Sequence, residues 1–198
     1  MTSDRSGAEA VLIEGVHDVE DCTRAAAALL QTAVDRGVTL AIAESLTGGQ
    51  VSSSLVEVPG ASRVLVGAVV AYATRIKAQV LGVDAAHLER TGPVDREVAL
   101  QMAHGVRRLL GADLGLATTG VAGPGAVDGH PAGTVHVAVV GPRGEGHREL
   151  HLTGDRSQVR RATVIDVCEL AIGFCAKKGV GHGPDRSSPM VNQLQITD

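Results

Sequence analysis

The stretch Ala43-Glu44-Ser45-Leu46-Thr47-Gly48-Gly49 follows a short apolar run, residues 38–42, and precedes a segment with helical composition. The apolar run is rich in β-branched residues, which is typical of a buried strand. Glycines let the backbone approach a ligand closely, and the N-terminus of a helix offers unpaired N–H groups to an anion. Ser45 is therefore well placed for chemistry, although the commoner role of such a serine or threonine is to cap the helix.

Apolar periodicity and turn residues predict an alternation of helices and strands along the rest of the chain. The run 64–71 has the composition of a buried strand, and Asp155 and Gln158 have the spacing of a capping box at the start of the last helix. The expected helices cover residues 19–36, 48–56, 74–81, 95–110 and 155–177, and the expected strands cover 38–43, 64–71, 113–119, 133–140 and 147–152. This order predicts an α/β fold, a layered α/β/α domain with a mixed β-sheet.

We expect one domain over residues 18–178, within the usual size range. The polar residues 1–17 and the Gly-, Pro- and Ser-containing residues 179–198 show no clear periodicity, so they are expected to be a flexible leader and a flexible tail. The first residues lack the apolar core of a signal peptide, and no apolar run approaches the length of a membrane span. We therefore expect a soluble, cytoplasmic protein without a membrane partner.

The composition restricts the kinds of partner further. The net charge is −4, and the chain has no Trp, one Tyr and one Phe. Neither a basic field for nucleic acid nor aromatic platforms for base stacking are present, which favours a small-molecule substrate and no nucleic acid. The three cysteines fit no zinc spacing and are expected to be free thiols, and we expect a homo-oligomer.

Several common signatures are absent from the sequence: the P-loop, the dinucleotide-binding glycine motif, the G-x-S-x-G elbow and the H-E-x-x-H metal motif. We therefore expect no cofactor and no metal.

Lys77 is a candidate base for Ser45. It follows a strongly apolar strand, and desolvation near a buried strand end lowers the pKa of an ammonium. A neutral lysine can deprotonate a serine hydroxyl, as in the Ser-Lys variants of serine catalysis. Tyr72 could hydrogen-bond the pair or relay its proton. The alternative is that Lys77 is an ordinary surface lysine, and the spacing alone does not decide between the two.

A second glycine-rich loop, residues 118–125, also follows a predicted strand. Such loops present backbone N–H groups that suit a phosphate or carboxylate, although a simple turn is an equal alternative. Arg156, at the start of the last helix, is a candidate phosphate partner because its guanidinium matches phosphate geometry. Two such loops after buried strands indicate a shared site at one edge of the sheet.

Together these segments resemble the CinA C-terminal domain family. The similarity covers roughly residues 20–177 in the family's order, and it rests on AESLTGG (43–49), VPGAS (58–62), VVAYATRIKAQVLGV (69–83), VDREVALQMAHGVR (94–107), TGVAGPG (119–125), PAGTVHVAV (131–139) and GDR (154–156). The chain departs from the family at Ala73-Thr74, where Ser-Asn is frequent, and at residues 126–128, where more glycines are frequent. Both departures concern contacts to substrate. Many family members carry a further N-terminal domain, so this chain resembles the stand-alone amidase form.

The resemblance implies hydrolysis of nicotinamide mononucleotide to nicotinate mononucleotide and ammonia, in pyridine nucleotide salvage. It assigns the catalytic roles to Ser45, Lys77 and Tyr72. We expect Thr47, Gly48 and Gly49 to bind substrate, with Thr47 capping the helix and the N–H groups near the two glycines stabilising the oxyanion. The residues expected to bind the 5′-phosphate are Thr119, Gly120, Gly123 and Arg156. The alternatives are an amidase for another small amide and a catalytically silent nucleotide-binding or regulatory module.

Overall fold

Five strands form one mixed sheet in the order β2-β1-β3-β4-β5, within residues 17–176, the part of the chain that the computed structural model describes. β1 pairs in parallel with both β2 and β3, whereas β4 pairs antiparallel with β3 and with β5. The strands are β1 (Leu40–Glu44), β2 (Leu65–Val70), β3 (Leu114–Gly120), β4 (Thr134–Gly141) and β5 (Gly144–His151). The parallel half of the sheet therefore brings the carboxyl ends of three strands to one edge.

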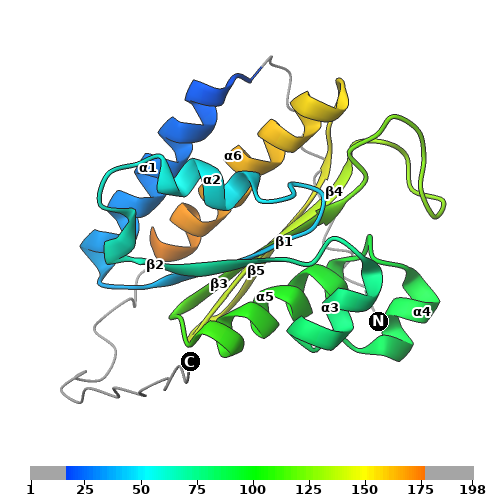
Figure 1. Ribbon diagram of the computed structural model, residues 1–198, viewed down its shortest axis with the longest axis horizontal. Coiled ribbons are helices and arrows are strands. Elements are labelled where there is room, and N and C mark those ends of the chain that lie inside the picture. The colour runs from blue at the N-terminus through cyan, green and yellow to red at the C-terminus, as the bar shows by residue number, and fades with distance from the viewer. Residues whose placement is uncertain (1–16, 177–198) are drawn as a thin grey trace, which may run out of the picture.

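Helices cover both faces of this sheet (Figure 1). In that view α1 (Val19–Arg36), α2 (Gln50–Val56) and α6 (Arg156–Ala176) lie above the sheet. The helices α3 (Thr74–Leu81), α4 (Ala85–Thr91) and α5 (Arg96–Leu110) lie below it, and a short 3-10 helix, η1 (Ala61–Arg63), precedes β2. The prediction of an α/β fold with helical layers around a mixed sheet is confirmed.

Two apolar cores separate these layers. Leu29, Leu116 and Val167 belong to the core between the sheet and α1 and α6, and Leu81 and Met102 belong to the core on the α5 side. Phe174 is the one aromatic residue among the described residues of these cores. This is the arrangement expected when buried strands carry apolar residues on both faces.

Close approach of backbones fixes the helix that carries Lys77. A Cβ at Gly105, on α5, would overlap the carbonyl oxygen of Leu81 at the end of α3. Only glycine at this position lets α3 pack so closely on α5, and α5 in turn packs on the sheet. The helix α3, which carries Lys77, is thereby held near the edge of the sheet where the parallel strands end.

Most predicted elements are confirmed, with shifts of one to three residues at several ends. The capping box is confirmed: Asp155 accepts from the N–H groups of Ser157 and Gln158, and the Gln158 side chain accepts from the Asp155 N–H. The expected last residue of that helix, residue 177, and the expected leader up to residue 16 and tail from residue 179 lie outside the described residues.

Two expectations about the chain between β1 and α5 were wrong or incomplete. The run 64–71 is not a fully buried strand, because β2 is an edge strand whose residues alternate between half-buried and exposed, with Val66 and Val70 each 48% exposed. The helix α4 was not predicted, since it is only seven residues long; it follows the N-cap Asp84.

Candidate functional site

The candidate site is a pocket at the carboxyl ends of β1, β2 and β3. It encloses about 200 Å³. Its walls come from the turns after the three strands, from the α4–α5 connection and from the start of α6. The lining residues are Ser45, Leu46, Tyr72, Lys77, Pro93, Val94, Thr119, Gly120, Val121, Ala122, Gly123, Val127 and Arg156.

Ser45 and Lys77 form the polar centre of this pocket. Lys77 Nζ lies 2.8 Å from Ser45 Oγ, within hydrogen-bond distance, although 32 residues separate them in sequence. Nζ also donates to the carbonyl oxygen of Ala71 at 2.8 Å. The lysine is 1% exposed and the serine 8%, so the pair is removed from bulk water apart from the pocket opening. Lys77 is therefore not a surface lysine.

The surroundings of Lys77 make its ammonium easier to deprotonate. Burial lowers its pKa to about 8, because an ammonium loses hydration in this apolar surrounding. No carboxylate within residues 17–176 forms an ion pair with it. A neutral amine has one lone pair and two N–H groups. With one N–H on the Ala71 carbonyl, the lone pair is available to the Ser45 hydroxyl.

Glu44, the residue before the serine, is the part of the site that sequence reasoning missed. Its carboxylate is fully buried and accepts from the N–H groups of Gly49, Val51 and Ser52 and from the Ser52 hydroxyl, at 2.8–3.0 Å. This is an N-cap supplied from the end of the preceding strand, and the helix dipole stabilises its negative charge. The N-terminus of α2 is thus occupied by the protein's own anion.

Three expectations about the turn between β1 and α2 are wrong. Neither Ser45 nor Thr47 caps α2, since the N-cap position is Gly49 and the capping oxygens belong to Glu44. The Gly49 N–H donates to Glu44 and the Gly48 N–H donates to the Ser45 carbonyl, so neither is free to hold an oxyanion. Gly48, Gly49 and Thr47 also lie outside the pocket lining.

Thr47 has a structural contact instead. Its side chain is fully buried and hydrogen-bonds the hydroxyl of Thr118, on β3, at 2.8 Å. The Ser45 N–H donates to the Thr118 carbonyl at 3.0 Å. These two bonds fasten the turn after β1 to the neighbouring strand. They leave the N–H of Leu46, which lines the pocket, without an acceptor among the described residues.

Tyr72 and Arg156 lie together at the rim. Arg156 donates to the Tyr72 hydroxyl at 3.1 Å and to the Gly123 carbonyl at 2.9 Å. Tyr72 is 60% exposed, and within the described residues its hydroxyl contacts Arg156 rather than Ser45 or Lys77. The expected hydrogen bond from Tyr72 to the Ser45–Lys77 pair, the dyad, is therefore absent from this arrangement. The expected closeness of Arg156 to the glycine-rich loop is observed.

The loop after β3 and the α4–α5 connection form another part of the pocket wall. Gly120 and Gly123 line the pocket, as does Thr119, whose hydroxyl donates to the Pro93 carbonyl at 2.7 Å. Thr119 therefore anchors the wall at Pro93 with its hydroxyl. The N–H of Ala122 has no acceptor among residues 17–176, and Ala122 lines the pocket.

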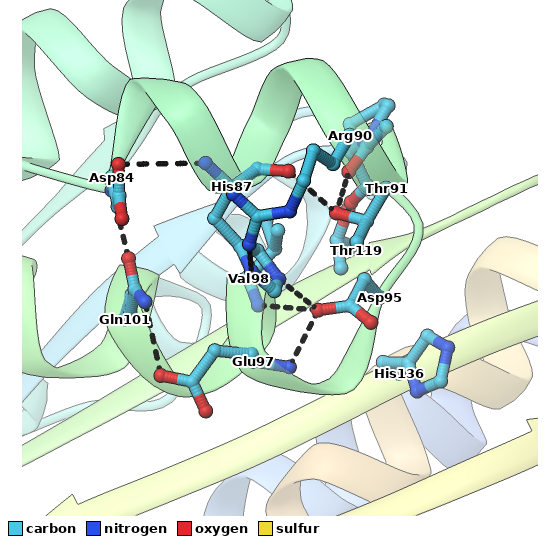
Figure 2. A network of polar contacts seen from close by, with 12 residues as sticks. Asp84, His87, Arg90, Thr91, Asp95, Glu97, Val98, Gln101, Thr119 and His136 are labelled. Atoms are coloured by element: carbon cyan, nitrogen blue, oxygen red, sulfur yellow. Dashed lines mark hydrogen bonds and ion pairs between the residues drawn. The ribbon is translucent and has the colours of Figure 1, made fainter.

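A polar network supports this wall from outside the pocket (Figure 2). Asp95 caps α5 by accepting from the N–H groups of Glu97 and Val98, and it also hydrogen-bonds His87 Nε2 at 2.8 Å. Arg90 faces the other ring nitrogen of His87 at 3.3 Å and can only donate, so Nδ1 accepts and Nε2 carries the proton. The network ties α4 to the start of α5 and holds the connection that contains Pro93 and Val94.

The departures from the family pattern lie in different places. Ala73 and Thr74 begin α3 and do not line the pocket, whereas Val127, in the second departing segment, does. Within residues 17–176, no group of three His, Cys, Asp or Glu side chains could hold a metal ion. The three cysteines are buried free thiols, as expected. No helix among the described residues is long and apolar enough to cross a membrane.

Comparison with known proteins agrees with this architecture. A CinA-like protein of Frankia casuarinae is 47% identical over 69% of this chain and 32% of its own length. The crystal structure of the competence/damage inducible protein CihA from Agrobacterium tumefaciens superposes with a TM-score of 0.75 at 33% identity, covering 82% of this chain and 99% of that one. A CinA superfamily protein from Escherichia coli gives a TM-score of 0.73 at 30% identity, covering 82% and 94%.

The chain spans about a third of the length of the curated relatives that it matches, whereas it covers nearly all of the solved chains. The family model named CinA C-terminal domain matches residues 22–174, which is almost the whole of the described fold. The chain belongs to the CinA C-terminal domain family.

Proposed function

We propose that this protein is a Ser-Lys amidohydrolase that converts nicotinamide mononucleotide to nicotinate mononucleotide and ammonia. The observation that carries the proposal is the 2.8 Å contact between Ser45 Oγ and the buried Lys77 Nζ at the base of a pocket. A nucleophile within hydrogen-bond reach of a base with a lowered pKa is the arrangement that acyl transfer requires.

The chemistry runs in two halves. Neutral Lys77 takes the proton of Ser45 as Oγ bonds to the carboxamide carbon, and the Leu46 N–H donates to the oxyanion that forms. When the C–N bond breaks, the Lys77 ammonium returns its proton to the leaving nitrogen, which departs as ammonia. Water then attacks the acyl carbon, gives a proton to Lys77 and releases the carboxylate, while Ser45 regains its proton.

The pocket dimensions agree with a substrate that is held in two parts. Its volume of about 200 Å³ is below the range of about 300–1,000 Å³ typical of sites that enclose a whole ligand. The aliphatic walls at Leu46, Val94 and Val121 suit a flat pyridine ring with its carboxamide at the dyad. The ribose and phosphate then lie toward the rim, where Arg156 and the free Ala122 N–H can bind the phosphate.

The Ser45–Lys77 pair indicates which kind of bond is cleaved but not which group is attached to that bond. An amidase for another small amide is therefore the main alternative. Arg156 favours a phosphorylated substrate, because its guanidinium is at the pocket rim and no carboxylate within residues 17–176 forms an ion pair with it. A silent binding module is a weaker alternative, because it has no need of a buried lysine beside a serine.

Ammonia release from nicotinamide mononucleotide, nicotinamide riboside and nicotinamide tests these possibilities together. We expect turnover of the mononucleotide, at least about tenfold less with the two compounds that lack phosphate, and none with Ser45→Ala. Arg156→Ala should raise KM for the mononucleotide and remove the preference for phosphate. Ser62→Ala is the matched control, since Ser62 is exposed and outside the pocket. A Ser45→Ala protein that still released ammonia would exclude the proposed nucleophile.

A further inference from the structure

Arg160, one turn after Arg156 on α6, is a second arginine beside the site that the mechanism has not used. Its Nη2 donates to the carbonyl oxygen of Thr47 at 2.6 Å, a contact that joins residues 113 apart in the chain. Arg160 does not line the pocket and therefore has no direct access to a substrate bound there. Within residues 17–176 no carboxylate forms an ion pair with it.

The Thr47 carbonyl is one end of a chain of peptide groups that leads back to the pocket. The peptide group joining Thr47 and Gly48 receives the guanidinium at its oxygen and donates its N–H to the carbonyl of Ser45 at 3.1 Å. The peptide group joining Ser45 and Leu46 receives that bond at its oxygen. Its own N–H, that of Leu46, has no acceptor among the described residues, and Leu46 lines the pocket.

Hydrogen bonds in such a chain polarise one another, and a charged donor at one end strengthens the acidity of the N–H at the other. We infer that Arg160 is a positioning residue that polarises and orients the Leu46 N–H as an oxyanion donor, acting through two peptide groups. The inference rests on the proposed role of Ser45 as an acylated nucleophile, and it adds the source of oxyanion stabilisation that the occupied Gly48 and Gly49 amides do not supply.

Charge and simple tethering make different predictions at this position. Arg160→Lys keeps the charge on a side chain that is one atom shorter, whereas Arg160→Gln keeps an N–H donor without the charge on a side chain that is two atoms shorter. A relayed charge requires that Arg160→Gln lose activity that Arg160→Lys keeps. Rescue of Arg160→Ala by a small cation or by its neutral isostere then separates the effect of charge from that of reach.

The test measures acetylation of Ser45 by p-nitrophenyl acetate, followed by nitrophenolate release and by the mass of the Ser45 peptide. This small ester depends on the nucleophile and the oxyanion donor but not on recognition of a nucleotide. One oxyanion donor is worth roughly 10²–10³ in kcat, and polarisation accounts for part of it, so we expect Arg160→Gln to react about 5–20-fold more slowly than Arg160→Lys. Arg24→Gln, on the exposed face of α1, is the control for loss of an arginine.

Chemical rescue of Arg160→Ala separates the same possibilities within one protein. Guanidinium at low concentration should restore acetylation, whereas urea, its neutral isostere, should not. Equal rates for Arg160→Gln and Arg160→Lys, or equal rescue by urea, would overturn the inference. With nicotinamide mononucleotide, the Arg160→Gln defect should lie in kcat and not in KM, because Arg160 is outside the pocket.

The two proposals fail differently. Acetylation of Ser45 in the wild type without ammonia release from the mononucleotide would refute the proposed substrate, while the Arg160 comparison would still give its result. A wild-type Ser45 that is never acetylated would overturn both, because no nucleophile would then remain to be assisted.

Discussion

At the scale of single residues, Lys77 is a cationic group that the fold removes from water. Burial, with no compensating carboxylate, lowers its pKa to about 8. The ammonium form predominates below that pH and cannot accept a proton, and the neutral form predominates above it. The activity of the dyad should therefore follow the neutral fraction of this one amine.

We predict that the rate of Ser45 acetylation rises with pH, has its midpoint near pH 8 and levels off above it. The limiting slope below the midpoint should be tenfold per pH unit, since one proton is lost. Stopped-flow measurement of nitrophenolate release from pH 6 to 10 gives the profile, corrected for spontaneous ester hydrolysis. Lys77→Met should be slow at every pH. A wild-type profile that stays flat across this range would show that Lys77 is not the base.

Glu44 makes a second prediction at this scale, in stability. The carboxylate accepts four hydrogen bonds, three of them from backbone N–H groups of α2. In Glu44→Gln one oxygen becomes an NH2 group that faces donors, so at least one buried N–H loses its acceptor, at a cost of about 1–3 kcal/mol. For a chain of this size each kcal/mol lowers Tm by about 2–4 °C. Calorimetry of Glu44→Gln checks the loss, with the exposed Glu57→Gln as the control.

At the scale of elements, the start of α2 shows how one helix end can be closed to ligands by the strand that precedes it. The sequence indicated a helix N-terminus at the two glycines, and a helix N-terminus is a common anion site. The helix does begin there, but Glu44 reaches the site from the last position of β1 and fills it. The position of Glu44 within the 43–49 motif gave no indication of where its side chain points.

The start of α5 makes a prediction about the pocket wall. Asp95→Ala removes the cap from the Glu97 and Val98 N–H groups and the bond to His87 (Figure 2). Loss of such a cap costs about 1–2 kcal/mol, which lowers Tm by about 2–8 °C. Because Pro93 and Val94 immediately precede the cap and line the pocket, KM for the mononucleotide should rise several-fold.

Acetylation of Ser45 should be nearly unchanged in Asp95→Ala, because neither Ser45 nor Lys77 hydrogen-bonds Asp95 or its partners. Gln101→Ala is the matched control: it removes the acceptor of the Asp84 N–H at the far side of the network but leaves the Asp95 cap intact. If Gln101→Ala raised KM as much as Asp95→Ala does, the wall would not depend on the cap.

At the scale of the whole molecule, local signals predicted elements well and long-range contacts poorly. Helices 19–36 and 74–81 are observed at their predicted bounds, because apolar periodicity and terminal glycines are local features. The edge position of β2 depends on strand order, which no local pattern contains. Likewise, the sequence nominated Ser45 and Lys77, but their distance depends on β1 and β2 being parallel neighbours and on the packing of α3 against α5.

The burial of Lys77 also has a consequence for the stability of the whole fold. The pKa of this lysine is about 8 in the folded protein and near 10.5, its ordinary value, in the unfolded chain. Between these values the unfolded chain binds more protons than the folded protein, so folding becomes more favourable as pH rises. Below pH 8 the full penalty for holding the ammonium applies, and above about pH 10.5 it is absent.

We predict that the free energy of unfolding of the wild type rises relative to that of Lys77→Met as pH increases from 8 to 10.5. Each unit of pKa difference is worth about 1.4 kcal/mol, and all other groups titrate alike in both proteins, so the difference isolates one amine. Urea denaturation of both proteins at pH 7, 8, 9 and 10 measures it. A difference that does not change with pH would mean that Lys77 has the same pKa folded and unfolded, and it would remove the physical basis for a lysine base at this site.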